Sequence, residues 1–244
     1  MVPCRDAAPW VVEMLESLSS QARKPDEVVM VDDGSTDGSP DVVQRWLDSQ
    51  LSPLPVQLLR RSQRGVAATT REAIGVSSGE LVVRVDADDL VHPEFLLELE
   101  KALEKNPGAA YAYPAMRAFG AREARYPTQV FDATALVYAG NFVCAAALMR
   151  RSTYDRTRGY ADLPAWEDWD LWLSFLEVGG TGVLVDRELY LWRRHEASRN
   201  TQSLVERRFL RLRIWWRHRR LLVRYWRGGP RALAGRVARP VRDQ

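Results

Sequence analysis

The first half of the chain alternates short apolar runs with stretches in which apolar residues recur every three or four positions. The apolar runs predict buried strands at 26–31, 56–60 and 81–85. The wider spacing predicts helices at 10–18, 41–47 and 66–77. Because strands that alternate with helices form βαβ units, the sequence predicts an α/β fold whose sheet is mostly parallel and flanked by helices.

The second half of the chain has a less regular pattern. A helix is expected from 93 to 105, where the sequence "NPG" ends it. Another is expected within 165–180, whose first turn is acidic and whose apolar residues share one helical face. Strands are predicted at 109–116, 141–151, 181–186 and 188–195.

Two acidic clusters, at 32–33 and 86–89, each follow a predicted strand directly. The carboxyl ends of parallel strands meet at one edge of a sheet, where ligands bind, so we expect both clusters to face one cleft. Crowded carboxylates repel one another unless a cation compensates, and a divalent metal is the simplest such cation. The alternative for the second cluster is a simple turn in which Asp89 caps the next helix.

Length and composition fit a main domain over 1–204 and an appendage over 205–244. No window approaches the roughly 20 apolar residues of a bilayer span, and the start "MVPCRDAAPW" does not resemble a secretory leader. Cys4 and Cys144 are the only cysteines and lie far apart, so we expect neither a disulfide framework nor a zinc site. These features predict a cytoplasmic protein.

The appendage is strongly basic. It holds thirteen arginines against Glu206 and Asp243, a charge of about +11, which leaves 1–204 near −8. Apolar residues recur in it at helical spacing, namely Val205, Phe209, Leu212, Trp216, Val223 and Trp226. Such a helix is typical of a peripheral element on an anionic membrane surface, and equally of a helix that packs on its own domain. Nothing else in the chain supports nucleic-acid binding, so none is expected.

Three stretches occur in a telling order: "VVMVDDGSTDGS", "GVAATTREAIGVSSGELVVRVDADDLVHPEFL" and "WEDWDLWLSFLEVGG". They resemble glycosyltransferase family 2, the inverting nucleotide-sugar transferases of GT-A fold, across nearly all of 1–204. The resemblance implies a Rossmann-like GT-A sheet. It also implies transfer from a nucleotide sugar, with a UDP-sugar expected, to a hydroxyl of a carbohydrate or lipid-linked acceptor. Cell-envelope, exopolysaccharide or glycolipid synthesis is the setting that it implies.

The resemblance assigns nucleotide binding to several positions. Asp33 matches the carboxylate that accepts a hydrogen bond from uracil, and Pro3 and Arg5 lie where the first strand touches the nucleotide. Arg71 is expected to serve the diphosphate by a shifted route, since many members carry Arg-Asn where this chain has Thr70 and Arg71. Because the chain begins at "MVPC", most of the first strand is expected to be absent.

The D-x-D sequence of the second cluster matches the metal site of the family. Asp88 corresponds to the principal ligand of Mg²⁺ or Mn²⁺, and Asp86 is expected to assist through the ribose or the metal. The ion would act as a Lewis acid on the leaving diphosphate. His195 matches an additional metal ligand, although a lone histidine after a strand is equally compatible with a surface or packing role.

The "WED" sequence matches the catalytic position of the family. Asp168 corresponds to the general base that takes the acceptor proton, with Glu167 beside it. Acids at the start of a helix are also favoured by the helix dipole without any catalytic role. Trp166 is expected to form a wall for the acceptor sugar, and a core or interface position is the alternative.

Two other functions remain in view. A nucleotidyltransferase also uses paired aspartates and a metal, but the chain has no Gly-rich phosphate loop. A non-catalytic module that binds a nucleotide sugar or is recruited to a membrane is the stronger alternative, because the first strand is short.

Overall fold

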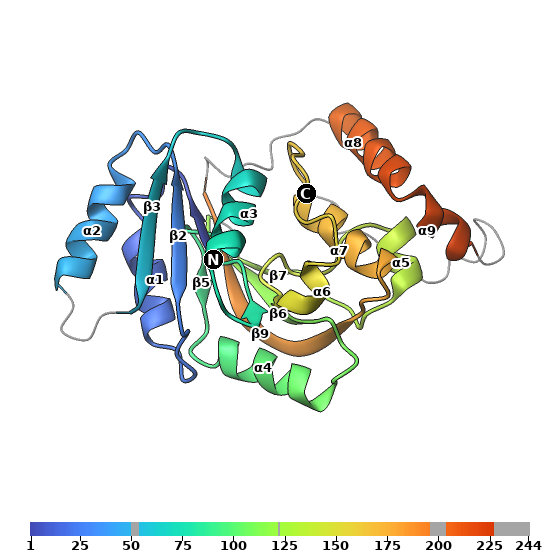
Figure 1. The fold of residues 1–244 in the computed structure, drawn as a ribbon, viewed down its shortest axis with the longest axis horizontal. Helices are drawn as coiled ribbons and strands as arrows, with labels where there is room; N and C mark the ends of the chain where they lie inside the picture. Colours follow the sequence, from blue (N-terminus) through green and yellow to red (C-terminus); the bar gives the residue numbers. More distant parts are fainter. Residues whose placement is uncertain (50–53, 122, 196–203, 227–244) are drawn as a thin grey trace.

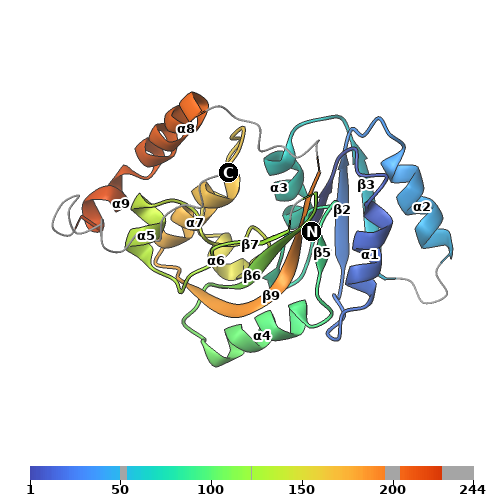
Figure 2. The same ribbon diagram turned by 180° about the vertical axis from the view of Figure 1, so that it is seen from behind.

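The computed structural model describes residues 1–49, 54–121, 123–195 and 204–226 (Figure 1). Two sheets lie side by side, and helices cover their faces. Figures 1 and 2 place helices α8 and α9 beside α5 and α7, at the end of the molecule opposite α2. The α/β class expected from the sequence is confirmed. The expectation of one mostly parallel sheet was wrong, because only the first of the two sheets is parallel and the second is mixed.

The first sheet has the order β1-β2-β3, and both of its pairings are parallel. Its strands are β1 (Val2–Cys4), β2 (Val28–Asp33) and β3 (Val56–Arg61). The helices that follow them are α1 (Val11–Ser19), α2 (Ser39–Ser49) and α3 (Val66–Val76). This arrangement is the βαβ alternation that the apolar pattern predicts, and it brings the carboxyl ends of β1 and β2 together.

The strand expected at 81–85 is shorter than predicted and joins the two sheets. Strand β4 comprises only Leu81–Val82. Beyond it, the amino group of Met1 donates to the carbonyl of Val83 at 2.7 Å, and the Val85 N–H donates to the carbonyl of Met1 at 3.0 Å. Residues 83–85 therefore run beside the start of the chain without forming a regular ladder.

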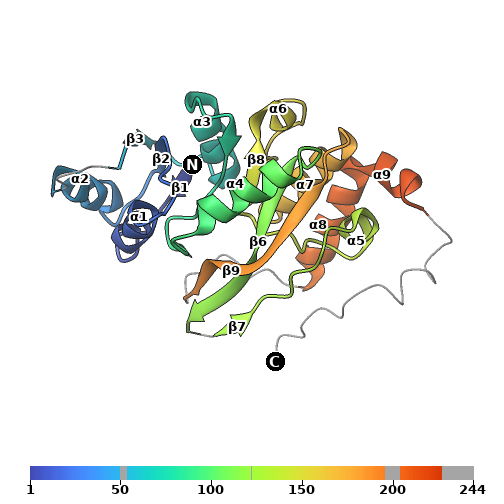
Figure 3. The ribbon, with the colours of Figure 1, turned by 90° about the horizontal axis from the view of Figure 1, so that it is seen from below.

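The second sheet is mixed, with the order β4-β8-β6-β9-β5, and β7 pairs with β6. Its remaining strands are β5 (Leu90–Val91), β6 (Tyr111–Gly120), β7 (Ala124–Arg125), β8 (Leu148–Arg150) and β9 (Gly182–Arg194). Only β6 and β9 pair in parallel; the other pairings are antiparallel. Figure 3 shows β6 and β9 side by side, with α4 (Phe95–Lys105) over them.

The prediction of separate strands at 181–186 and 188–195 was wrong, because β9 is continuous. Its register against β6 shifts beside Pro114, so that Val185 faces Pro114 and Glu188 faces Ala115. Proline has no N–H to donate to a ladder, which favours an irregularity at this place. The polar break near 187 is therefore a bulge within one long strand.

The strand expected at 141–151 was also largely wrong, since only its last part forms β8. Before it comes a helix that the sequence pattern did not indicate, α5 (Ala133–Tyr138). Asp132 caps this helix, accepting from the N–H groups of Thr134 and Ala135 at 2.8 and 3.0 Å. The loop from α5 to β8 lies next to α7 (Glu167–Glu177). In the chain, the short helix α6 (Arg151–Tyr154) comes between β8 and α7.

Helix α7 lies at the centre of the apolar core. Trp169, Trp172 and Phe175 are fully buried, and the ring centroid of Trp172 is 4.7 Å from that of Tyr111 on β6. Burial of each such side chain contributes about 2 kcal/mol or more. The acidic start of α7 is therefore held in place by its aromatic body.

The described part of the basic appendage, up to Trp226, forms two helices rather than one, α8 (Leu204–Arg217) and α9 (Arg219–Arg224), with His218 between them. Leu210, Ile214 and Leu221 are buried against the domain. The opposite face leaves five large apolar side chains 57–79% exposed, namely Phe209, Leu212, Trp216, Val223 and Trp226. Among the described residues, no helix combines the length and hydrophobicity of a bilayer span.

Candidate active site

A cavity of about 480 Å³ lies between the second sheet, the start of α7 and helix α8. Of the residues predicted from the sequence, it is lined by Asp86, Asp88, Trp166, Glu167 and Asp168. The walls also include Asp89, from the acidic cluster that was expected to face a cleft. Four further wall residues had no expected role in the site, namely Arg84, Asn141, Arg207 and Arg211. The structure thus brings the D-x-D and W-E-D sequences to one hollow.

Arg84 joins these two sequences directly. Its side chain is buried, and Nε and Nη2 donate to the two carboxylate oxygens of Asp86 at 2.7 and 3.0 Å. Its Nη1 donates to Oε1 of Glu167 at 2.9 Å. The guanidinium therefore compensates part of the negative charge of the acidic loop. From the sequence, a metal ion alone was expected to compensate this charge. An arginine inside the apolar run "LVVRV" was the available signal for it.

Asp88 and His195 form the second close pair. Oδ2 of Asp88 lies 2.9 Å from Nε2 of His195, which follows the end of β9. The imidazole stacks on Trp10 with a centroid distance of 4.2 Å. The histidine is therefore positioned against the D-x-D loop, as the resemblance implied, and it is also packed, as the alternative implied.

Asp89 does not cap the following helix. Its carboxylate is buried and accepts from the Tyr190 hydroxyl at 2.5 Å and from the Arg193 N–H at 2.7 Å. Burial, with repulsion from Asp88 and Asp86, raises the pKa of Asp89 well above its ordinary value. Asp89 thus ties β9, and with it His195, to the acidic loop.

The residues present are compatible with a divalent metal that the substrate helps to hold. Within the described part of the chain, no three His, Cys, Asp or Glu side chains group closely enough to bind an ion by themselves. Mg²⁺ is commonly bound by one or two carboxylates together with substrate phosphates. Asp88, with His195 beside it, could supply the protein ligands of such an ion. Asp86 is less available for this role, because both of its carboxylate oxygens accept hydrogen bonds from Arg84.

Asp168 has the environment of a general base. Its Oδ2 accepts a hydrogen bond from Nδ2 of Asn141 at 2.7 Å. Asn141 lies in the loop after α5, and this bond orients the Asp168 carboxylate. Burial, together with repulsion from Glu167 and against attraction from Arg84, raises the pKa of Asp168 from 3.8 to about 7. A carboxylate with a pKa near neutrality can both hold and release a proton under ordinary conditions.

Trp166 turns the chain into α7 in a strained conformation. Its φ of 60° lies in the left-handed region, which costs a bulky residue on the order of 1–3 kcal/mol. The indole lines the cavity and meets that of Trp169 edge to face at 5.8 Å. This conformation sets the position from which Glu167 and Asp168 enter the cavity.

Asp33 lies outside this cavity. Its two oxygens accept from the backbone N–H groups of Arg64 and Gly65, at 2.6 and 2.9 Å, just before α3. Its neighbour Asp32 is also buried, and among the described residues its Oδ1 has no hydrogen-bond partner. The open acceptor at the end of β2 is therefore Asp32, the neighbour of the Asp33 that the resemblance matched to the uracil contact.

Pro3 and Arg5, which were also expected to touch the nucleotide, likewise lie outside the cavity. Pro3 is buried opposite Val31, and Arg5 is exposed and pairs with Asp6 at 3.5 Å. Both stand at the same sheet edge as Asp32, because Cys4 faces Asp32 in the register.

Arg71 is engaged elsewhere, with the loop that precedes the W-E-D sequence. It donates to the carbonyl of Tyr160 and to both carboxylate oxygens of Asp162, the latter at 3.0 and 3.1 Å. In this structure Arg71 therefore holds that loop to α3.

Comparison with known proteins gives a consistent result. Residues 1–160 match the profile of the family described as glycosyl transferase family 2. The chain is 28% identical over 186 residues to the putative glycosyltransferase EpsE of Bacillus subtilis, a match that covers 74% of this chain and 66% of EpsE. The chain thus spans just under two thirds of the length of that relative.

Two solved structures share the fold. Staphylococcus aureus TarS 1-349 in complex with UDP-GlcNAc has a TM-score of 0.70 at 17% identity, over 92% of this chain and 70% of that one. The mannosyltransferase PcManGT from Pyrobaculum calidifontis, in complex with GDP-Man and Mn²⁺, has a TM-score of 0.67 at 22% identity, over 96% and 70%. The expected GT-A fold is thereby confirmed.

Proposed function

The chain belongs to glycosyl transferase family 2, and we propose that it moves a sugar from a nucleoside diphosphate sugar to an acceptor hydroxyl with inversion. The observation that carries this proposal is the environment of Asp168. This carboxylate has a pKa near 7, is oriented by Asn141, and shares one cavity with the D-x-D loop.

The proposed reaction is a single displacement. The acceptor oxygen attacks the anomeric carbon from the face opposite the diphosphate, and the bond from that carbon to the diphosphate oxygen breaks. Asp168 takes the proton that the hydroxyl loses, within hydrogen-bond reach of the attacking oxygen. Glu167, bound to Arg84, holds the adjacent negative charge in a fixed position and thereby keeps the proton affinity of Asp168 high.

Asp88 and His195 are proposed to hold Mg²⁺ or Mn²⁺ together with the diphosphate. The ion would supply Lewis-acid stabilisation of the leaving group. Asp86, fixed by Arg84, is proposed to face the ribose rather than to ligate the ion. The Mn²⁺ complex of PcManGT supports this assignment by analogy of fold.

The donor is proposed to be a UDP-sugar. The buried, unpaired Oδ1 of Asp32 offers an acceptor for the imide N–H of uracil, and Asp33 fixes the adjacent backbone. Pro3 and Arg5 border the same edge, and Arg71 is proposed to reach the diphosphate only after it releases Asp162. TarS binds UDP-GlcNAc and PcManGT binds GDP-Man, so the two neighbours support a nucleotide sugar, and Asp32 alone supports uridine.

The acceptor and its location form the last part of the proposal. Trp166 is proposed to stack on an acceptor sugar, since its indole lines the cavity beside the base. The exposed apolar side chains of α8 and α9 stand among arginines, a combination suited to the anionic inner face of the cell membrane. A carbohydrate or lipid-linked acceptor of envelope or exopolysaccharide synthesis fits this cytoplasmic, peripheral position.

The decisive experiment measures UDP release from a panel of UDP-sugars, with GDP-mannose for comparison, in the presence of Mn²⁺. We expect release from at least one UDP-sugar, and a loss of about a hundredfold or more in Asp168→Asn with unchanged UDP binding. Asp48→Asn, an exposed change on α2, is the matched control. Normal turnover by Asp168→Asn would remove the assignment of the base. UDP binding without any turnover would favour the non-catalytic module.

A further inference from the structure

Helix α8 contributes two arginines to the wall of the cavity. Arg207 and Arg211 lie one helical turn apart, both are half-buried, and both line the hollow that contains Asp168. Arg211 donates to the carbonyl of Ala139 at 2.8 Å, and its guanidinium lies 5.5 Å from the ring centroid of Trp169. Among the described residues, neither arginine forms an ion pair with a carboxylate.

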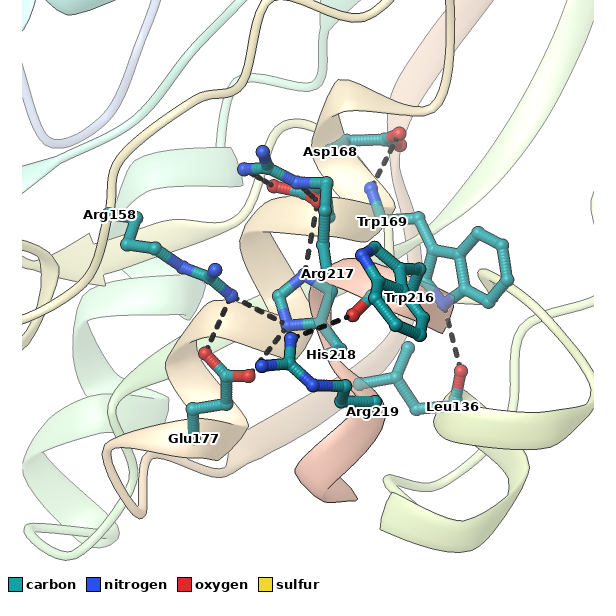
Figure 4. Close-up of polar contacts among 10 residues, drawn as sticks. Leu136, Arg158, Asp168, Trp169, Glu177, Trp216, Arg217, His218 and Arg219 are labelled. Carbon is teal, nitrogen blue, oxygen red and sulfur yellow. Dashed lines mark hydrogen bonds and ion pairs between the residues drawn. The ribbon is translucent and has the colours of Figure 1, made fainter. Parts of the chain in front are cut away.

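Three other arginines near the cavity and beneath α8 are paired with carboxylates. Arg84 binds two carboxylates, as described above. Arg217 donates from Nε to the buried carboxylate of Asp170 at 2.7 Å, and Arg158 pairs with Glu177 at 2.7 Å (Figure 4). Burial lowers the pKa of Arg211, because its charge lies partly out of water without a compensating anion. An anionic ligand would supply that compensation.

The position of the two arginines relates them to the acceptor rather than to the leaving diphosphate. Arg211 contacts Ala139 and Trp169, which are neighbours of Asn141 and Asp168 in the chain. The proposed metal pair belongs to other elements, the loop after β4 and the end of β9. An anion held by α8 would therefore lie on the side of the general base, where the acceptor must bring its hydroxyl.

The docking of α8 explains why this arrangement is rigid. His218 Nε2 lies 3.0 Å from Oδ1 of Asp170, and its Nδ1 lies 3.0 Å from Oε1 of Glu177 (Figure 4). Asp170 is fully buried on α7, two residues after the base. The same helix thus carries the base and the anchor of α8, which fixes the arginines relative to Asp168.

We propose that Arg207 and Arg211 bind a phosphate group of the acceptor and so select a phosphate-bearing acceptor for transfer. This inference rests on the proposed function, since it assigns a class of acceptor to the same cavity. Arginine presents paired N–H donors that match phosphate oxygens, and such charge-assisted hydrogen bonds are strong in a partly buried site.

The test is a binding titration of the full chain already saturated with UDP and Mn²⁺, so that the donor site is filled. Glycerol 3-phosphate and geranyl phosphate are the probes, and glycerol and geraniol are their neutral counterparts. We expect each phosphate ester to bind at least about tenfold more tightly than its neutral counterpart. Preference for the geranyl ester would identify a lipid-linked source of the phosphate, and equal binding of the two esters a water-soluble one.

Arg207→Gln is the central variant, because Arg207 makes no described contact that its replacement would break. We expect it to weaken phosphate-ester binding about tenfold, and Arg207→Gln with Arg211→Gln to abolish it, while UDP affinity is unchanged. Arg208→Gln, one position away and exposed, is the control and should bind as the unaltered chain does.

Three results would overturn the assignment. The first is equal binding of a phosphate ester and its neutral counterpart, and the second is unchanged binding in the double variant. The third is binding of a phosphate ester to the chain without UDP that saturation with UDP abolishes, since the anion would then occupy the diphosphate position. If the unaltered chain does not bind UDP, the proposed function itself fails. This outcome is distinguished from failure of the phosphate site alone, because UDP is titrated before the phosphate esters.

Discussion

Arg84 donates a hydrogen bond of 2.9 Å to Glu167, across 83 positions of the sequence. Since the same guanidinium also binds Asp86, it fixes the D-x-D loop relative to the start of α7. The two sequences that carry the proposed chemistry are thus joined by one buried cation, and the spacing between the metal side and the base side of the cavity depends on it.

Replacement of this cation should destabilise the fold. Arg84→Met leaves Asp86 and Glu167 without their shared partner in a buried position, and removal of one member of a buried ion pair typically costs about 3–5 kcal/mol. The free energy of unfolding, measured in urea, should fall by that amount. Arg60→Met removes an exposed ion pair with Asp41 and should cost less than about 1 kcal/mol. Equal effects of the two changes would contradict a special role for Arg84.

The pH dependence of transfer should report the carboxylate of Asp168. Its pKa is raised to about 7, and a general base must be deprotonated, so kcat/KM should rise with pH through about 7 and then level off. Asn141→Ala removes a donor that favours the charged form, which should move this limb to higher pH. The measurement is a pH–rate profile of UDP release. A limb near pH 4 would show that the active base is an ordinary exposed carboxylate.

Much of the first sheet could be predicted from the sequence, because the information there is local. Strands β2 and β3 and helices α1 to α3 follow from apolar periodicity alone. The D-x-D sequence does not follow β4 directly as expected, because β4 ends at Val82. Strand β9 could not be delimited, because its continuity across the polar residues near 187 depends on pairing with β6 and Pro114.

The site shows the same division between local and distant information. That Asp88 and Asp168 line one cavity could be predicted, because their motifs are short and continuous. The contacts of Asp33 could not be predicted, because the backbone N–H groups of Arg64 and Gly65 that bind it come from a loop 31 and 32 positions away. Likewise, no local pattern indicates that Arg217 meets Asp170, which is why the docking of α8 was left between two alternatives.

The buried ion-pair network beneath α8 should control the docking of the appendage. Asp170→Ala removes the carboxylate that Arg217 and Nε2 of His218 share, and we expect a loss of about 3–5 kcal/mol in the free energy of unfolding. Hydrogen exchange of the α8 and α9 amides should increase more than that of β2. Asp155→Asn, an exposed change, is the control. Unchanged protection of α8 would mean that Leu210 and Ile214 suffice to hold it.

The exposed face of α8 and α9 should bind anionic membranes. Phe209 and Trp216 are 68% and 71% exposed, and exposed arginines such as Arg220 stand beside them. Apolar insertion and attraction to anionic headgroups act together, so we expect flotation with vesicles that contain phosphatidylglycerol and little with neutral phosphatidylcholine. Phe209→Ser with Trp216→Ser should reduce the bound fraction about tenfold or more, because two large apolar side chains are lost from the interface.

The controls for this experiment separate the membrane face from general stickiness. Val130→Ser alters a side chain that is 75% exposed but lies outside the appendage, and it should float as the unaltered chain does. Raised salt should weaken binding, since the headgroup attraction of arginines is screened. Equal flotation of the unaltered chain and the Phe209 and Trp216 double variant would exclude insertion of this face. Leu210, Ile214 and Leu221 are buried and hold α8 and α9 on the domain in either case. With membrane insertion excluded, the remaining proposed role of these helices would be to place Arg207 and Arg211 in the wall of the cavity.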